Sequence, residues 1–450
     1  MKLYILGISG TFMSGLAILA KEAGFEVTGC DAQCYSPVKE LLQQKNIPWH
    51  EGYEVNNAFL EADCVIVGNA MKRGVPIVEA MLAQKKPYIS GPQWLFEQVL
   101  CKRRVIAIAG THGKTTTTSM LAHILDQAGL QPGFLIGGVA PNFQTNARLG
   151  AGEWFVIEAD EYDSAFFDKR PKFMHYHHEI AVLHNLEFDH ADIYTHLEAI
   201  EQQFPYYFRP VPTNGVVLMP RADEALNRVI QQGLYSPLET MSVGDSADWS
   251  AQPLTEGFMI ARQHQPLATV NWKLLGHFNR ANGLSAFAAS QRAGVTPDQA
   301  AHALSTFIPV KRRLELKGEV RGISVYDDFA HHPTAIQKTL EALKASQRHP
   351  RIWAVLEFAS YTMKTGVHAD KMLQALSSAD EVLVLSPQAF ELKICNAPSW
   401  RVYPTTQQMI EAIMVGAKAG DAVLVMSNRG FENIHMRLLQ ALQPQAPVTP

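Results

Sequence analysis

The chain has 450 residues, enough for about three domains of ordinary size. Its 39 Lys and Arg and 43 Asp and Glu leave a net charge of −4. That balance argues against a broad nucleic-acid-binding surface, which needs an excess of cations to neutralise phosphates. A composition that is 47% hydrophobic and 18% charged can fill several cores and excludes a disordered chain.

Other composition features point to a soluble, reduced, cytoplasmic enzyme. No apolar run approaches the roughly 20 residues that cross a bilayer, so we expect no membrane insertion. The opening segment MKLYILGISG lacks the small-residue cleavage pattern of a signal peptide. The few cysteines are odd in number and form no disulfide framework: Cys30, Cys34, Cys64, Cys101 and Cys395. The sequence does not indicate an oligomeric state.

Short runs rich in Val, Ile and Leu alternate with amphipathic stretches along nearly the whole chain. The runs are Leu3–Leu6, Val65–Val67, Arg104–Ala109, Phe155–Ile157, Ile180–Leu183, Ile352–Leu356, Glu381–Leu385 and Ala422–Met426. This alternation is typical of βαβ units and predicts an α/β fold with parallel sheets. The pattern restarts near 102 and near 311, so we expect domains at 1–101, 102–310 and 311–450. Within the second of these, residues 205–275 predict an antiparallel side sheet or an irregular insert.

The first strand runs into a glycine-containing turn, Gly7-Ile8-Ser9-Gly10, before a helix-like stretch. Such a turn binds the phosphates of a nucleotide, or it merely packs tightly between strand and helix. NAD binding is a weaker alternative, because the spacing of the glycines is not GxGxxG. Asp31 lies at the end of the second predicted strand, just after Glu26–Gly29, where a ribose or base is often bound.

The strongest local signal is GTHGKTT at 110–116, between the buried strand Arg104–Ala109 and a helix-like stretch. Glycines at 110 and 113 let backbone N–H groups converge on phosphate oxygens, and the helix N-terminus adds partial positive charge. Lys114 can bridge the β- and γ-phosphates, and the Thr115 hydroxyl can ligate Mg²⁺. The spacing is shorter than the common GxxxxGK[ST] pattern, and an ordinary tight turn is the alternative.

Two acidic motifs follow strands of the same predicted domain. EADE occupies 158–161 and NLEFDH occupies 185–190. Ligands sit at the carboxyl ends of parallel strands, so we expect both motifs to face the phosphate loop and to hold a hard cation. A solvated acidic turn is the alternative. His175-Tyr176-His177-His178 does not predict a zinc site, because consecutive residues on a strand cannot all face one ion.

In order and spacing, GTHGKTT, EADEYD, NLEFDH, GHFN at 276–279, Arg312-Arg313 and YDDFAHHP at 326–333 resemble the Mur ligases, the ATP-dependent ligases of bacterial cell-wall synthesis. The resemblance covers essentially the whole chain. It implies a Rossmann-like N-terminal UDP-binding domain, a central P-loop ATPase domain with a parallel sheet and a small side sheet, and a Rossmann-like C-terminal domain for the incoming amine. It also implies ATP and Mg²⁺ as cofactors, an acyl phosphate formed on a carboxylate, and release of ADP and phosphate.

The stretches LGISGTFMSGLA, IVGNAMKRGVP, YISGPQWL and VYDDFAHHPTAI are similar to the branch that joins L-alanyl-γ-D-glutamyl-meso-diaminopimelate to UDP-N-acetylmuramate in murein recycling. The alternative within the family is addition of L-alanine to UDP-N-acetylmuramate. From another class, a non-enzymatic UDP-sugar-binding regulator would not need Lys114, Glu158 and His190.

The resemblance implies roles for individual residues. The expected catalytic residues are Lys114, Glu158, His190, Arg313 and Asp328, and the expected metal ligands are Thr115, Glu158 and His190. The expected ATP contacts are Gly110, Thr111, His112, Gly113, Lys114, Thr115, Thr116, Phe278, Asn279, Asn282, Arg313 and Asp328. The expected UDP-sugar and peptide contacts are Gly7, Gly10, Thr11, Phe12, Met13, Ser14, Asp31, Asn69, His332 and Lys364. Asp160 and Glu161 are weaker candidates for the metal.

One segment, FASYTMK at 358–364, departs from the family pattern. Ala359 stands where we expect an Arg, a residue suited to a bidentate grip on a peptide carboxylate. Lys364 and Arg429 are the candidates to take over that contact.

Overall fold

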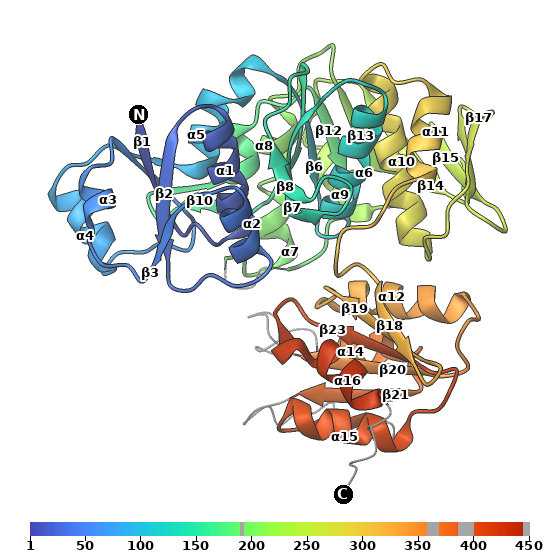
Figure 1. The fold of residues 1–450 in the computed structure, drawn as a ribbon. Helices are drawn as coiled ribbons and strands as arrows, with labels where there is room; N and C mark the ends of the chain where they lie inside the picture. Colours follow the sequence, from blue (N-terminus) through green and yellow to red (C-terminus); the bar gives the residue numbers. More distant parts are fainter. Residues whose placement is uncertain (190–192, 358–368, 386–399, 444–450) are drawn as a thin grey trace, which may run out of the picture. The chain divides into compact units, whose positions relative to one another are not determined.

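A computed structural model describes residues 1–189, 193–357, 369–385 and 400–443. His190, Ala359 and Lys364 lie outside these residues. The chain forms two compact units. The first unit comprises Met1–Phe188, His196–Lys273 and Arg280–Val310, and the second comprises Asp189–Thr195, Leu274–Asn279 and Lys311–Pro450. Each unit is an α/β assembly of sheets covered by helices, as the alternating pattern predicts (Figure 1).

The first unit opens with a parallel sheet of five strands in the order β3-β2-β1-β4-β5. The strands are β1 (Lys2–Leu6), β2 (Glu26–Asp31), β3 (Trp49–Glu51), β4 (Cys64–Val67) and β5 (Tyr88–Ser90). The helices are α1 (Thr11–Glu22), α2 (Val38–Gln44), α3 (Asn57–Leu60), α4 (Pro76–Ala83), α5 (Gly91–Gln98) and the 3₁₀ turn η1 (Leu100–Lys102). The central strand β1 is buried from Leu3 to Leu6, which explains its continuous apolar run. The strand order reverses beside β1, so the turn that follows β1 lies where doubly wound sheets bind ligands.

A second sheet has ten strands in the order β17-β16-β15-β14-β13-β12-β6-β9-β7-β8. The strands are β6 (Arg104–Ala109), β7 (Gly133–Ala140), β8 (Thr145–Arg148), β9 (Trp154–Glu158), β12 (Ile180–Leu183), β13 (Val216–Pro220), β14 (Leu238–Val243), β15 (Trp249–Pro253), β16 (Phe258–Arg262) and β17 (Gln265–Val270). Its helices are α6 (Lys114–Gln127), α7 (Leu197–Glu201), α8 (Pro205–Phe208), α9 (Glu224–Ile230), α10 (His277–Arg292) and α11 (Pro297–Ser305). The buried strand β6 pairs in parallel with β12 and β9, so three strand ends converge at the phosphate loop.

Residues 205–275, for which we expected a side sheet or an insert, extend this same sheet. β13, β14 and β15 continue it in parallel, and β16 and β17 close its edge as antiparallel strands. The last hairpin turns at Gln263 and His264, which both adopt positive φ values of 48° and 66°. Positive φ at both central residues is typical of a tight hairpin turn, yet neither residue type signals one in the sequence.

A short hairpin ties the first sheet to the second. It is formed by β10 (Asp163–Ala165) and β11 (Asp168–Pro171), and the 3₁₀ turn η2 (Lys172–His175) follows it. Ala165 is fully buried in the same hydrophobic cluster as Tyr4 and Leu6 of β1. Helix α1 also packs against β7 and β8, where Asn146 Nδ2 donates to the Thr11 carbonyl at 2.9 Å. The turn after β1 is therefore anchored to the second sheet.

The described residues of the second unit form a sheet of six strands in the order β18-β19-β23-β20-β21-β22. The strands are β18 (Glu315–Val320), β19 (Ile323–Asp328), β20 (Ile352–Glu357), β21 (Glu381–Leu385), β22 (Trp400–Tyr403) and β23 (Ala422–Met426). The helices are α12 (Pro333–Ala345), α14 (Ala369–Ala375), α15 (Thr406–Gly416), the 3₁₀ turn η3 (Phe431–Asn433) and α16 (Ile434–Leu442). Two separate apolar clusters form, one beneath α12 and α14 and the other beneath α15 and α16. The sheet therefore carries helices on both faces.

Among the helices of the described residues, none is long and apolar enough to cross a membrane. The four described cysteines, at 30, 34, 64 and 101, are free thiols.

Candidate active site

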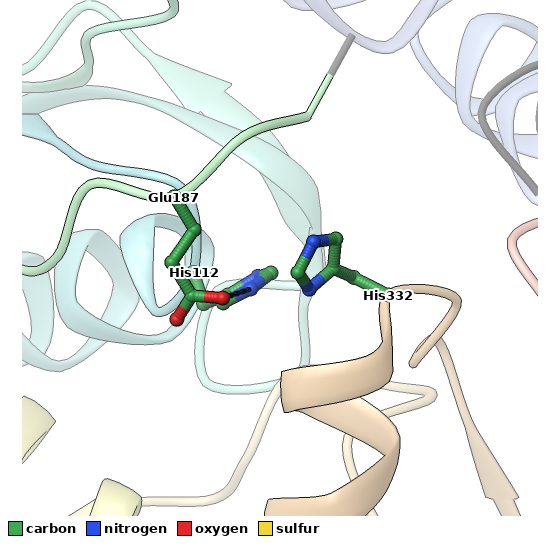
Figure 2. Close-up of side chains that lie close together, drawn as sticks. All are labelled: His112, Glu187 and His332. Carbon is green, nitrogen blue, oxygen red and sulfur yellow. Dashed lines mark ion pairs between the residues drawn. The ribbon is translucent and has the colours of Figure 1, made fainter. Parts of the chain in front are cut away.

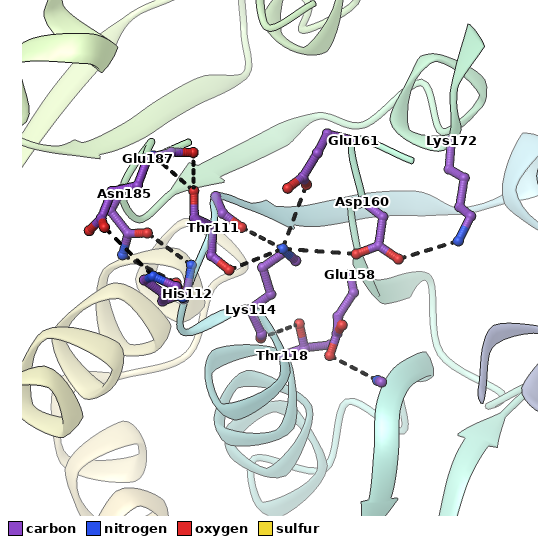
Figure 3. Close-up of polar contacts among 12 residues, drawn as sticks. Thr111, His112, Lys114, Thr118, Glu158, Asp160, Glu161, Lys172, Asn185 and Glu187 are labelled. Carbon is purple, nitrogen blue, oxygen red and sulfur yellow. Dashed lines mark hydrogen bonds and ion pairs between the residues drawn. The ribbon is translucent and has the colours of Figure 1, made fainter. Parts of the chain in front are cut away.

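The phosphate loop lies between β6 and α6 and needs glycine at both of its predicted positions. Gly110 has φ +123°, and a Cβ added there would lie 2.9 Å from the Asn185 carbonyl oxygen. Gly113 caps α6 with φ +92°. The loop after β12 clamps this turn, because Asn185 accepts the Thr111 N–H at its carbonyl (2.9 Å) and the His112 N–H at Oδ1 (2.8 Å). The clamp holds the loop against the motif that begins at Asn185 (Figure 3).

The NLEFDH motif makes two further contacts with the loop. The Glu187 N–H donates to the Thr111 hydroxyl at 2.9 Å. The Glu187 carboxylate also lies 3.8 Å from His112 Nε2 (Figure 2). These contacts place residues 185–187 of the motif beside the phosphate loop, as expected from adjacent parallel strand ends.

Lys114 points back over the loop that carries it. Its ammonium donates to the Gly110 carbonyl at 2.5 Å and forms ion pairs with Asp160 (3.9 Å) and Glu161 (3.6 Å). Its side chain is only 12% exposed. The EADE turn therefore reaches the phosphate loop through Lys114 (Figure 3).

Glu158 ends β9 and is buried against the start of α6. The backbone N–H of Gly137 donates to its Oε1 at 2.8 Å, and the Thr115 hydroxyl also hydrogen-bonds the carboxylate. Burial raises the pKa of Glu158, and the nearby Asp160 carboxylate adds to that rise. An ionised carboxylate that is buried in this way is costly unless a cation lies beside it. Two of the three expected metal ligands, Thr115 and Glu158, are thus neighbours, whereas His190 lies outside the described residues.

Two of the expected ATP contacts in the first unit pack beside or behind the loop. Asn282 of α10 is buried, and its Oδ1 lies 2.6 Å from the position of an added Cβ on Gly113. Thr116 is buried on the first turn of α6. Phe278 and Asn279 belong to the second unit, where Asn279 Nδ2 donates to the Leu275 carbonyl at 2.7 Å. Their predicted role at the nucleotide stays a prediction.

Arg313 and Asp328 come together in the second unit. The Asp328 carboxylate accepts N–H groups of Leu314 (2.6 Å) and Ala330 (2.7 Å). Burial raises the pKa of Asp328 to about 6, and the Arg313 guanidinium opposes that rise. The same guanidinium lies 5.0 Å from the centre of the Phe329 ring. The structure therefore joins the two residues, and their contact with ATP stays a prediction.

His332 stands at the N-terminus of α12, where its Nδ1 accepts the Thr334 N–H at 3.3 Å (Figure 2). Its side chain is buried. A capping role explains this position without a ligand, so its predicted contact with the peptide substrate rests on the sequence alone.

The turn after β1 is braced by Asp31. The Asp31 carboxylate accepts the Ser9 N–H (2.9 Å), the Ser9 hydroxyl (2.5 Å), the Ala32 N–H (2.7 Å) and the Tyr53 hydroxyl (2.9 Å). With its oxygens engaged in this way, Asp31 is placed to shape the turn. The direct contact with a ribose or base that the sequence suggests for Asp31 stays a prediction.

The other expected UDP-sugar residues line the carboxyl edge of the first sheet. Gly7, which has φ +81°, follows β1 directly, and Asn69 is the second residue after β4. Gly10 and Thr11 are exposed and Phe12 is half-buried, whereas Met13 and Ser14 are buried. The contacts of all these residues with a UDP-sugar stay predictions.

The sequence does not predict the contacts that three residues make near the loop: Gly137, Lys172 and Asn185. Gly137 and Lys172 belong to no phosphate-binding motif, and Asn185 was noted only as the start of an acidic motif. The one available signal was the pair Gly137-Gly138 inside a strand, where glycine often marks a close approach of other groups.

Three family descriptions match the chain in succession. They are "Mur ligase family, catalytic domain" over residues 2–102, "Mur ligase middle domain" over 108–290 and "Mur ligase, glutamate ligase domain" over 312–429. The domain limits expected at 101 and 311 stay a prediction.

Known proteins resemble the chain over its whole length. It is 47% identical to the UDP-N-acetylmuramate–L-alanyl-γ-D-glutamyl-meso-2,6-diaminoheptandioate ligase of Escherichia coli, over 99% of both chains. A crystal structure of a murein peptide ligase from Psychrobacter arcticus matches with a TM-score of 0.77 and 44% identity, over 99% of both chains. The UDP-N-acetylmuramate–L-alanine ligase of Renibacterium salmoninarum is 33% identical over 85% of this chain and 81% of its own.

Proposed function

The chain belongs to the Mur ligase family, and we propose that it joins the tripeptide L-alanyl-γ-D-glutamyl-meso-diaminopimelate to UDP-N-acetylmuramate in murein recycling. It is an ATP-dependent ligase that forms a carbon–nitrogen bond. The observation that carries the tripeptide as substrate is the 47% identity over the full chain to a ligase of that name, against 33% to an L-alanine ligase.

The chemistry follows from the weakness of a carboxylate as an electrophile. One oxygen of the muramate carboxylate attacks the γ-phosphorus of ATP, the bond from that phosphorus to ADP breaks, and an acyl phosphate forms. The tripeptide's amine then attacks the acyl carbon, phosphate leaves with the bonding electron pair, and the amine gives up a proton. The protein's main task in the first step is to bring two anions together.

Residues of the first unit are suited to that task. Lys114 supplies a buried ammonium beside the phosphate loop, and the backbone N–H groups of that loop can bind phosphate oxygens. Mg²⁺ would be held by Thr115 and Glu158, whose buried carboxylate and hydroxyl are oxygen ligands of the kind it prefers, with His190 as the third predicted ligand. When bound, the metal would neutralise charge on the phosphates.

A paired assay tests the proposal. The purified protein is given ATP, Mg²⁺ and UDP-N-acetylmuramate with either the tripeptide or L-alanine, and phosphate release is measured. We expect turnover with the tripeptide and little with alanine. Turnover with alanine in place of the tripeptide would overturn the assignment, and failure with every amine would leave a UDP-sugar-binding protein.

The variant Lys114→Ala is the control for the site. It should lower phosphate release by about 10²-fold or more, because it removes a cation from the transferring phosphoryl group. Binding of UDP-N-acetylmuramate should remain within about twofold, because that ligand is assigned to the first sheet. Loss of both properties would contradict the division of roles between the two sheets.

A further inference from the structure

Lys172 is a buried lysine with an unusual position. It begins η2 directly after the hairpin β10–β11, and its side chain is only 8% exposed. Its backbone N–H donates to the Tyr162 carbonyl at 2.9 Å, so its main chain is fixed to the EADEYD segment. Lysines are rarely buried to this extent unless they are paired, because removing an ammonium from water is costly.

Two aromatic rings surround the Lys172 ammonium. It lies 5.1 Å from the centre of the Phe12 ring and 5.7 Å from the centre of the Tyr162 ring, both within the range of a cation–π contact. Phe12 is the second residue of α1, in the turn assigned to the UDP-sugar. The ammonium therefore reaches from η2 to the first turn of α1, at the edge of the sugar-nucleotide turn.

On its other side Lys172 shares one carboxylate with Lys114. Asp160 Oδ2 lies 3.4 Å from the Lys172 ammonium, and Asp160 Oδ1 lies 3.9 Å from the Lys114 ammonium (Figure 3). Both distances exceed the roughly 2.7–2.9 Å of a strong charge-assisted hydrogen bond. Asp160 is 27% exposed, whereas the two lysines are largely buried. The Lys114 and Lys172 ammonium groups thus lie on either side of the Asp160 carboxylate, to which Lys172 makes a long hydrogen bond.

We propose that Lys172 binds the carboxylate of the UDP-linked sugar acid and positions it beside the phosphate held by Lys114. This inference rests on the proposed function, which requires that carboxylate to travel from the sugar-nucleotide turn to the γ-phosphate. Lys172 contacts residues on both sides of that path, Phe12 on one and Asp160 on the other. It supplies on the acceptor side the positive charge that Lys114 supplies on the nucleotide side.

A pair of ligands isolates the carboxylate. UDP-N-acetylglucosamine carries the same nucleotide and a similar sugar but lacks the carboxylate of UDP-N-acetylmuramate. The dissociation constants of both ligands are measured for the wild type and for Lys172→Met, which removes the charge and keeps an unbranched apolar stem between the rings. Lys169→Met is the matched control, because Lys169 lies on the same hairpin with a side chain that is 70% exposed.

We expect Lys172→Met to weaken UDP-N-acetylmuramate binding by about 10- to 100-fold, the range set by one charged hydrogen bond. UDP-N-acetylglucosamine binding should change by less than about threefold, and Lys169→Met should change neither. Lys172→Arg, which keeps the charge, should retain most of the preference for the acid. Should Lys172→Met fail to fold, Lys172→Gln takes its place in the same comparison.

Equal weakening of both ligands would overturn the inference, because Lys172 would then bind the diphosphate or only support the turn. No weakening of either ligand would also overturn it. The proposed function fails by a different readout: turnover of the wild type with L-alanine in place of the tripeptide, or no turnover with any amine.

Discussion

Replacing Gly137 by alanine should strongly lower the rate of the reaction while changing the stability of the fold very little. Gly137 lies on β7, and a Cβ added there would be 2.5 Å from Glu158 Oε2 and 2.7 Å from Oε1. Ordinary carbon–oxygen contacts need about 3.3 Å, so the carboxylate would have to move by nearly 1 Å. A displacement of about 1 Å can lower a catalysed rate by 10²-fold, equivalent to about 2.7 kcal/mol of activation free energy.

The fold should tolerate the change because the obstructing atoms end a flexible side chain. We expect the free energy of unfolding to change by less than about 1 kcal/mol, the range for a glycine-to-alanine change inside a strand. Gly138→Ala is the matched control, because its added Cβ would lie 3.2 Å from a Val310 methyl group and 3.9 Å from that of Thr115.

The assay is phosphate release with the tripeptide at increasing Mg²⁺ concentration, together with the thermal midpoint of each variant. Gly137→Ala should lose about 10²-fold in rate or need much more Mg²⁺, and Gly138→Ala should stay within about fivefold of the wild type. If both variants turned over like the wild type, the position of Glu158 would not matter to the reaction. A fall in the thermal midpoint confined to Gly137→Ala would instead indicate a structural role.

Three further predictions follow from other contacts of the first unit. Burial lowers the pKa of His178 to about 3. Below about pH 6.5 the unfolded chain therefore binds a proton on this residue that the folded protein does not bind. The free energy of unfolding should fall by about 2 kcal/mol between pH 7.5 and pH 5 for this reason. In denaturant titrations, the free energy of unfolding of His178→Phe should lack this decrease between pH 7.5 and pH 5. If the variant lost as much stability as the wild type over that range, His178 would not be a buried neutral histidine. Asp31→Ala removes the acceptor of Ser9 and should weaken UDP-sugar binding by about 5- to 30-fold in calorimetry, without altering ATP binding. Asn185→Ala removes the acceptor of the His112 N–H and should raise the KM for ATP by about 5- to 30-fold, whereas an effect on the UDP-sugar alone would contradict the clamp.

The strands and the phosphate loop could be predicted because their signals are local. Arg104–Ala109 is a continuous apolar run, and the glycines of GTHGKTT follow it directly. Nearness of EADE and NLEFDH to the loop could also be predicted, because parallel strands end at one edge of a sheet. The hairpin turn at Gln263 and His264 could not, since its positive φ values arise in residue types that rarely signal a turn.

The finer contacts of the site depend on residues that are distant in the chain. Gly137 touches Glu158 across two neighbouring strands, and Lys172 meets Phe12 only because a hairpin carries it to the first sheet. Asp31 also braces the turn after β1, a role that its place at the end of a strand does not reveal in the sequence. Such contacts need the register of paired strands, which composition and spacing do not define.

The burial of Ala165 among the residues of β1 has a consequence for how the chain can be divided. The sequence changes character near residue 102, and a fragment ending there would keep every strand of the first sheet. It would nevertheless lose a piece of its own interior, which is supplied from more than sixty residues downstream. We therefore expect residues 1–102 to unfold together with the segment that contains Ala165, and a fragment ending near residue 102 should be prone to aggregation.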